Sequence, residues 1–362
     1  MKSARAPVAL ALALPALSGT AGCQAVGYYS QAVGGHLALM RAREPIERLL
    51  ADGATDPALK AKLATLVEAR RFAIDELGLP DTDSYRTYAA TGRRYVTWNV
   101  VAAGEFSLSP RTWCFPVAGC VSYRGYFAEE DAREYADGLV EAGYDVSVGG
   151  ASAYSTLGWF DDPVLDTMLR GSQLRHVGTL FHEMAHQRLY VKDDSDFNEA
   201  YATFVERRGV REWLAARGRD AEIAAWEASL ARGEAFADLL ADTRASLVEL
   251  YARGLDEGAT RDAKAAAFDA MRARYAALKA SWDGYAGYDG WFARELNNAR
   301  LVAVSTYRRR VPAFEALFER SGRDLERFHA AAEALGELPA EARAARLDEL
   351  GAAAAPSAGD GA

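Results

Sequence analysis

This sequence has few histidines and cysteines, no excess of positive charge and no long apolar run beyond its N-terminus. Its 362 residues include only five histidines and three cysteines, so any clustering of these residues is informative. The net charge of −9 argues against a nucleic acid as partner. Beyond the N-terminus no apolar run reaches the roughly 18 residues of a membrane-spanning helix, and we expect the mature body to be soluble.

The N-terminus has the pattern of a secretion signal. A positively charged start precedes an apolar stretch at 8–17, and small residues then lead to Cys23. The pattern resembles a bacterial lipoprotein signal, which predicts removal of residues 1–22 and lipidation of Cys23. Gln24 in place of an aspartate favours the outer membrane, with the body facing the periplasm. Ordinary secretion and an uncleaved anchor are the alternatives.

The other two cysteines lie close together in the sequence. Cys114 and Cys120 flank a short loop that contains Pro116 and Gly119. In an oxidising periplasm this spacing permits a local disulfide. Two buried free thiols are the alternative that the residues leave open. A zinc site is disfavoured because no histidine or further cysteine is adjacent.

Two of the five histidines form the pattern H-E-x-x-H, at His182 and His186 with Glu183 between them. On an α-helix, residues four apart lie on one face, so both imidazoles can bind a single ion. Glu183 projects about 100° away around the helix, where it can accept a proton from a water that the metal activates. The pattern therefore predicts one bound Zn²⁺ with Glu183 as general base.

A third ligand is needed, because a catalytic zinc usually takes three protein ligands and leaves one position for water. A second helix, expected at 195–208, carries Glu199 and Glu206 on its polar face. Either carboxylate reaches the ion if this helix folds back against the first. Twelve residues separate His186 from Glu199 and nineteen separate it from Glu206. From the residues alone, both glutamates are candidates.

Hydrophobic periodicity predicts an α+β fold in a single domain at 23–350. A small, mostly antiparallel sheet belongs to a mixed part at 24–163, followed by the zinc-site helices at 164–210 and a helical part at 211–350. The Gly- and Ala-rich tail at 351–362 is expected to be disordered. The expected strands are 95–101, 105–108, 121–127, 144–148 and 153–160. The main expected helices are 57–77, 128–142, 211–252, 260–282 and 290–305.

The motif Asn198-Glu199-x-x-Ala202 after H-E-x-x-H resembles the gluzincin metallopeptidases, whose second helix supplies a glutamate ligand. The chain as a whole is similar to a bacterial lipoprotein family of predicted zinc aminopeptidases. The shared segments are 27–31, 113–116, 123–127, 153–160, 181–187, 191–194, 197–199 and 297–300. The resemblance implies a zincin-like fold, aminopeptidase activity and Glu199 as the third ligand, with Glu206 as the alternative.

Peptide hydrolysis needs further groups that the motif does not contain. A donor normally stabilises the oxyanion, and the candidates are Tyr154, Tyr307 and His176. An aminopeptidase also needs an acidic group for the substrate's ammonium, for which Glu105 and Asp161 are candidates. The extended segment at 153–160 precedes the zinc helix, where an edge strand can pair with the substrate backbone.

Two functional hypotheses follow. The first is a zinc-dependent peptidase with a peptide substrate, tethered to the bacterial envelope. The second is a non-catalytic envelope lipoprotein, a scaffold or binding module, with a structural or vestigial zinc site. The long helices at 211–282 would give it a docking surface. A glutamate beside the first histidine favours the first hypothesis, because a structural site has no use for it. The oligomeric state is not set by the sequence.

Overall fold

The computed structural model describes residues 19–115, 119–153, 161–305 and 310–354, and it is α+β with helices predominating. The helices of its N-terminal part are α1 (Gly19–Arg41), α2 (Ile46–Ala51), α3 (Pro57–Asp75) and α4 (Glu129–Glu141). The strands are β1 (Arg43–Pro45), β2 (Thr87–Ala89), β3 (Thr97–Gly104), β4 (Trp113–Phe115), β5 (Gly119–Val121), β6 (Arg124–Tyr126), β7 (Tyr144–Ala151) and β8 (Val164–Leu165).

The rest of the described chain is helical. Its helices are α5 (Gln173–Arg188), α6 (Ser195–Ala215), α7 (Asp220–Ala252), α8 (Glu257–Ser281), α9 (Asp289–Phe292), α10 (Asn298–Ser305), α11 (Val311–Arg320), α12 (Leu325–Gly336) and α13 (Ala340–Ala354). No helix in the described part of the chain has the length and apolarity that a membrane crossing requires.

The strands form two three-stranded sheets and a hairpin. In the larger sheet β3 lies between β6 and β7 and is antiparallel to both, with Val100 opposite Val148 and Arg124. In the second sheet β2 pairs with β1 antiparallel and with β8 parallel. The β4–β5 hairpin is closed by a disulfide between Cys114 and Cys120. The prediction of a small, mostly antiparallel sheet is therefore confirmed, with the β2–β8 pair as the parallel exception.

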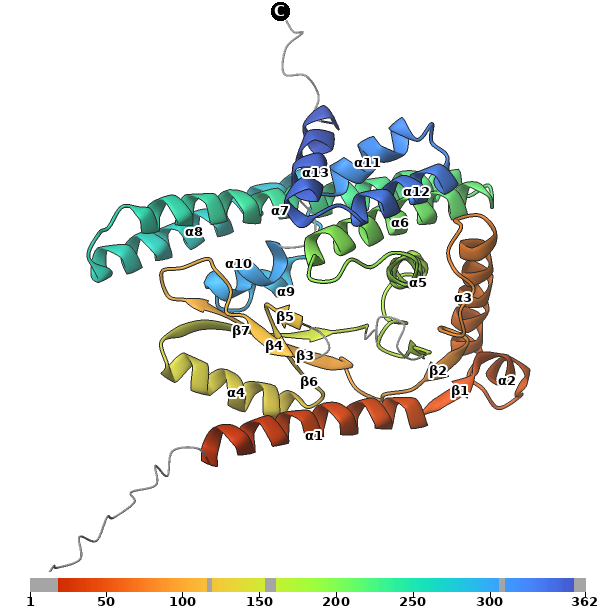
Figure 1. Ribbon diagram of the computed structural model, residues 1–362, viewed down its shortest axis with the longest axis horizontal. Helices are drawn as coiled ribbons and strands as arrows, with labels where there is room; N and C mark the ends of the chain where they lie inside the picture. The colour runs from red at the N-terminus through yellow and green to blue at the C-terminus, as the bar shows by residue number, and fades with distance from the viewer. Residues whose placement is uncertain (1–18, 116–118, 154–160, 306–309, 355–362) are drawn as a thin grey trace, which may run out of the picture.

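The elements lie in three levels (Figure 1). Helices α6, α7 and α8 form the upper level together with α11 to α13. The middle level holds α5 and the sheets, and α1 and α4 lie at the bottom, so that α1 and α13 are on opposite sides. Strand β8 leads directly to α5. Its pairing with β2 therefore fixes where the helix with the two histidines begins.

Five expectations about single elements need correction. The expected strand at 121–127 is divided between β5 and β6, which belong to different sheets. The segment 105–108 is a turn and not a strand, because the buried Asn298 amide donates to the carbonyls of Gly104, Glu105 and Ser107. The expected helix at 290–305 is split into α9 and α10. The expected break near residue 210 lies instead at Gly218, in the left-handed region at φ +64°, between α6 and α7. Helix α13 continues to Ala354, four residues into the tail predicted to be disordered.

Candidate metal centre

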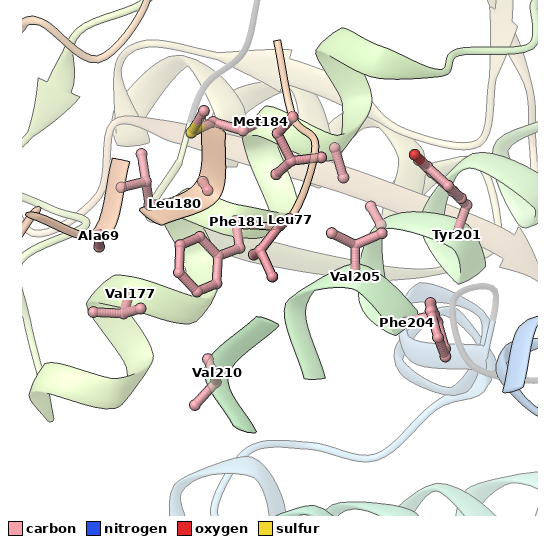
Figure 2. Packing of buried hydrophobic residues seen from close by; sticks show 14 of the residues in the cluster. Ala69, Leu77, Val177, Leu180, Phe181, Met184, Tyr201, Phe204, Val205 and Val210 are labelled. Carbon is pink, nitrogen blue, oxygen red and sulfur yellow. The ribbon is translucent and has the colours of Figure 1, made fainter. Parts of the chain in front are cut away.

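Helices α5 and α6 carry the metal-binding residues that the sequence predicts. Helix α5 begins after Ser172, whose hydroxyl accepts a hydrogen bond from the Arg175 backbone N–H (3.4 Å). Helix α6 begins after Asp194, whose carboxylate accepts from the Phe197 N–H (3.0 Å). Such caps satisfy N–H groups that a helix start leaves free. Figure 2 shows the apolar side chains of both helices meeting in the core, among them Phe181 and Val205.

Two glycines let α5 and α6 approach closely. A Cβ on Gly178 would lie 3.1 Å from Oε1 of Glu206, and a Cβ on Gly209 would lie 2.8 Å from the Phe181 ring. The two helices run antiparallel, because Gly178 lies against Glu206 whereas His186, later in α5, lies against Glu199, earlier in α6. Side chains late in α5 therefore face side chains early in α6. The close approach carries Glu206 to the ring of His182.

The loop between the two helices is fixed by Asn198, the first residue of the N-E-x-x-A motif. Its buried amide accepts a hydrogen bond from the Val191 N–H and donates one to the Val191 carbonyl, both at 2.7 Å. This pair of bonds holds the loop to the first turn of α6. The backbone of the next residue, Glu199, is therefore set in position beside α5.

Three side chains converge on one point. His182 Nε2 lies 3.2 Å from His186 Nε2 and 3.3 Å from Oε2 of Glu199, and His186 Nε2 lies 3.6 Å from Oε1 of Glu199. A tetrahedral ion with bonds of about 2.0–2.1 Å keeps its ligand atoms about 3.4 Å apart. The three residues thus have the spacing and the donor atoms of a group that could hold a metal ion.

Glu206, the other candidate ligand, contacts the opposite edge of the His182 ring. Its Oε2 lies 3.2 Å from Nδ1, which leaves Nε2 directed at His186 and Glu199. A carboxylate behind a ligand histidine fixes the ring and its tautomer and raises the basicity of the other nitrogen. Spacing alone could not separate the two glutamates. The geometry gives them different places around one imidazole.

The charges around this point stabilise a positive charge. Burial would lower the pKa of His182, but hydrogen bonds to Glu199 and Glu206 outweigh it and raise the pKa well above its usual value. Burial raises the pKa of Glu199, whereas His182 and His186 lower it, with a net lowering. Burial and the charge on His182 lower the pKa of His186 to about 4, so that ring is neutral. A neutral imidazole and an ionised carboxylate are the protonation states that bind metal.

Glu183 lies beside the group and is half-buried. Burial raises the pKa of this carboxyl to about 7, with the charges of Glu199, Asp162 and Glu206 adding to the effect and that of His182 opposing it. A carboxyl with a pKa near neutrality can both accept and release a proton at physiological pH. Asp162 is fully buried and follows Asp161, one of the two acidic residues considered for substrate binding.

Two tyrosines that sequence reasoning missed border the metal group. Burial, then the negative charge of Glu199, raise the pKa of Tyr123 and of Tyr190, although both side chains are partly exposed. The Tyr190 ring also lies edge-on to His186, with 6.4 Å between the ring centres. The sequence could have indicated Tyr190, because it follows His186 by four residues, just as His186 follows His182. Tyr123 comes from a different element, and only the fold brings it here.

The other predicted site residues have different positions. Tyr154 and Tyr307 lie outside the described residues, as does most of the expected substrate strand. His176 is buried on α5, and it is not one of the three residues that converge. Glu105 forms an ion pair with Arg261 of α8 at 2.6 Å, which makes it unsuitable for binding a substrate ammonium.

The disulfide hairpin β4–β5 reaches the loop that joins α5 and α6. Gly119, at φ +72°, lies so close to this loop that a Cβ there would be 2.5 Å from Oδ1 of Asp193. A glycine is required both by the left-handed backbone and by the contact. The hairpin thus contacts the loop between the two helices that carry His182, His186 and Glu199.

A comparison with protein-family models gives one match. The model described as "Putative aminopeptidase" matches residues 27–347. The chain belongs to this family. The matched range includes α5, α6 and the convergent residues His182, His186 and Glu199, so a peptidase function in general is supported. No curated protein and no solved structure matches the chain significantly.

Proposed function

We propose that this member of the aminopeptidase family is a zinc-dependent peptidase that removes residues from the N-terminus of peptides. The observation that carries the proposal is the convergence of His182, His186 and Glu199 at the spacing of a tetrahedral ion, with Glu183 beside them. In this proposal those three residues bind one Zn²⁺. Glu206 orients the first histidine.

The ion, when bound, would supply Lewis-acid chemistry by acidifying water and polarising the scissile carbonyl. Glu183 takes a proton from the attacking water and donates it to the leaving amine. Its pKa of about 7 suits both steps, because each form of the carboxyl is populated near neutral pH. The proton thus passes through one side chain.

Tyr123 and Tyr190 are the proposed hydrogen-bond donors to the substrate carbonyl oxygen. Their raised pKa values keep both phenols protonated at neutral pH, so each can donate. A preorganised donor at an oxyanion contributes about 100- to 1,000-fold to the rate.

A purely structural zinc site fits the geometry less well. Structural sites are closed by four protein ligands, whereas a catalytic site keeps a position open. Within the described part of the chain, the candidate group has three ligand residues. The scaffold hypothesis therefore has no specific observation in its favour. Lipidation at Cys23 and a periplasmic location at the outer membrane remain proposals that rest on the N-terminal sequence.

The test is metal content and peptide cleavage on one preparation. We expect one zinc per chain by elemental mass spectrometry and stepwise loss of N-terminal residues from a peptide library with varied N-termini. Chelation should abolish cleavage, and added Zn²⁺ should restore it. N-terminally acetylated peptides should resist cleavage. A zinc-loaded protein that cleaves none of the free peptides would overturn the proposal.

A further inference from the structure

A cavity of about 690 Å³ lies between α1, β6 and α4. Its walls are formed by Tyr28 of α1, Tyr126 of β6 and Tyr135 of α4, around the guanidinium of Arg124. Arg124 and Tyr126 are two residues apart on β6 and so point to the same face of the strand. The residues that line the cavity do not include His182, His186 or Glu199.

Arg124 is held between two aromatic rings. Its guanidinium carbon lies 4.1 Å from the centre of the Tyr28 ring and 4.4 Å from that of Tyr135. Both rings are themselves fixed, since Trp113 Nε1 donates to the Tyr135 hydroxyl at 2.8 Å and Tyr28 stacks on Phe115 at 5.5 Å. Both contacts are cation–π interactions between the guanidinium and a ring. Its N–H groups point outward from the edge and are not satisfied by the rings.

The edge of Arg124 has no acceptor among the described residues. Its buried Nε has no hydrogen-bond partner, and the side chain forms no ion pair within the described ranges. Burial raises the pKa of Tyr28 and Tyr126, so these walls are neutral phenols and supply no counter-charge. A guanidinium fork in such surroundings suits a carboxylate or phosphate, which can accept two parallel hydrogen bonds.

The mouth of the cavity carries charges of both signs. Arg111, Asp131 and Glu134 line it and are exposed. The two carboxylates lie three residues apart on α4 and thus on one face of the helix. Two carboxylates near the entrance would disfavour a simple anion. A ligand that is negative at its inner end and positive at its outer end would match both Arg124 inside the cavity and the two carboxylates at its mouth.

We propose that this cavity binds a short peptide by its C-terminal carboxylate. The carboxylate pairs with Arg124, and the peptide's ammonium lies near Asp131 and Glu134. The tyrosine walls accommodate a side chain of the peptide. Cavities of about 300–1,000 Å³ accept drug-sized ligands, a class that includes di- and tripeptides. The site is separate from the metal centre and requires no hydrolysis, so it can be tested whether or not the chain is a peptidase.

The test is isothermal titration calorimetry with the dipeptide glycyl-phenylalanine, in a Glu183→Gln background that prevents its cleavage. We expect saturable binding that weakens at least about tenfold when the dipeptide carries a C-terminal amide, because the carboxylate meets Arg124 away from bulk water. N-terminal acetylation should weaken binding less, by about two- to fivefold, because the charges at the mouth are exposed.

Variants assign the binding to this cavity. Arg124→Met should abolish it, and Arg124→Lys should retain part of it, which separates loss of charge from loss of the fork. Thermal melts of both variants show whether they fold. Glu134→Gln, on the exposed surface, should weaken binding of the dipeptide but leave binding of the N-terminally acetylated dipeptide unchanged. Glu130→Gln is the matched control on α4, since Glu130 does not line the cavity.

Three results would overturn the proposal. The first is equal affinity for the acid and the amide. The second is binding that a folded Arg124→Met variant leaves unchanged, which would assign the heat to the metal centre. The third is no binding at millimolar dipeptide to a folded parent protein. If the metal-dependent cleavage fails while this binding persists, only the proposed catalytic function is lost.

Discussion

Two helix pairs in this molecule, α5–α6 and α7–α8, differ in where they place their charged and polar side chains. On α7 the buried side chains form a stripe at spacings of three and four, including Phe236, Leu240 and Leu247. Charged residues lie outside this stripe, as in the pair of Arg274 and Asp242 at 2.6 Å, where both side chains are more than half exposed. This arrangement is that of a structural helix pair.

In α5–α6 the polar groups lie between the helices instead. His186 is 7% exposed, and Glu183 and Glu199 are each only partly accessible. Burying a charged or polar group costs free energy unless the group is paired or binds a metal. The buried Nδ1 of His186 has no hydrogen-bond partner within the described part of the chain, so this cost is not fully offset. Polar side chains that stay buried between two helices in spite of this free-energy cost indicate a functional site.

The largest expected effect is on catalysis. Glu183→Gln should lower kcat about 100- to 10,000-fold, because it removes the group that we propose to transfer the proton. Zinc content and Tm should stay close to those of the parent, which separates chemistry from folding. Cleavage rates on a single peptide measure the effect.

The matched control for this change is Glu249→Gln on α7, whose side chain is exposed. We expect unchanged kcat there. If both substitutions lowered kcat alike, or neither did, the functional contrast between the two helix pairs would be lost.

The next effect is on metal affinity, where two glutamates of α6 should differ. Glu199→Gln should remove a ligand and weaken zinc binding by more than about 100-fold, whereas Glu206→Gln acts through His182 and should cost about 10- to 100-fold. Competition with a chromophoric chelator measures both affinities. A larger loss in Glu206→Gln than in Glu199→Gln would reverse the assignment that the distances support.

A third effect concerns stability alone. Leu247→Ala on α7 should lower the free energy of unfolding by about 2–5 kcal/mol, because it empties a fully buried position. Its neighbour Val248 is 52% exposed, and Val248→Ala should change stability by less than about 0.5 kcal/mol. Urea denaturation measures both values. Zinc affinity should be unchanged in each, and a loss of metal in Leu247→Ala would show that the two helix pairs are coupled.

The sequence predicted those parts of this architecture that local spacing determines. Helical periodicity located α8 within a few residues, and H-E-x-x-H placed two imidazoles on one face, but α6 ends seven residues and α7 begins nine residues later than expected. Features set by tertiary contacts were missed. The 105–108 turn depends on Asn298, nearly two hundred residues away, and the place of Tyr123 beside Glu199 depends on the sheet. The choice between the two glutamates depended on the distance between helices, which Gly178 controls.

The smallest expected effect sharpens the contrast between buried histidines. His329 of α12 is fully buried, and both of its nitrogens are paired, with the Tyr201 hydroxyl at 2.8 Å and the Leu77 carbonyl at 2.9 Å, whereas Nδ1 of the buried His186 has no partner among the described residues. Burial lowers its pKa to about 4. Below pH 6.5 the unfolded chain takes up a proton that the folded chain does not bind. Stability should therefore be complete above pH 6.5 and fall as the pH drops towards 4.

The loss from this one group is at most about 3 kcal/mol at pH 4, from a shift of roughly 2.5 pKa units. In His329→Gln the decline of unfolding free energy between pH 6.5 and 4.5 should be shallower, whatever the stability of the variant at pH 7. Chemical denaturation across this range measures the slope. An unchanged slope would mean that His329 does not stay neutral when folded. The distinction between a satisfied structural histidine and a metal-binding one would then need evidence other than hydrogen bonding.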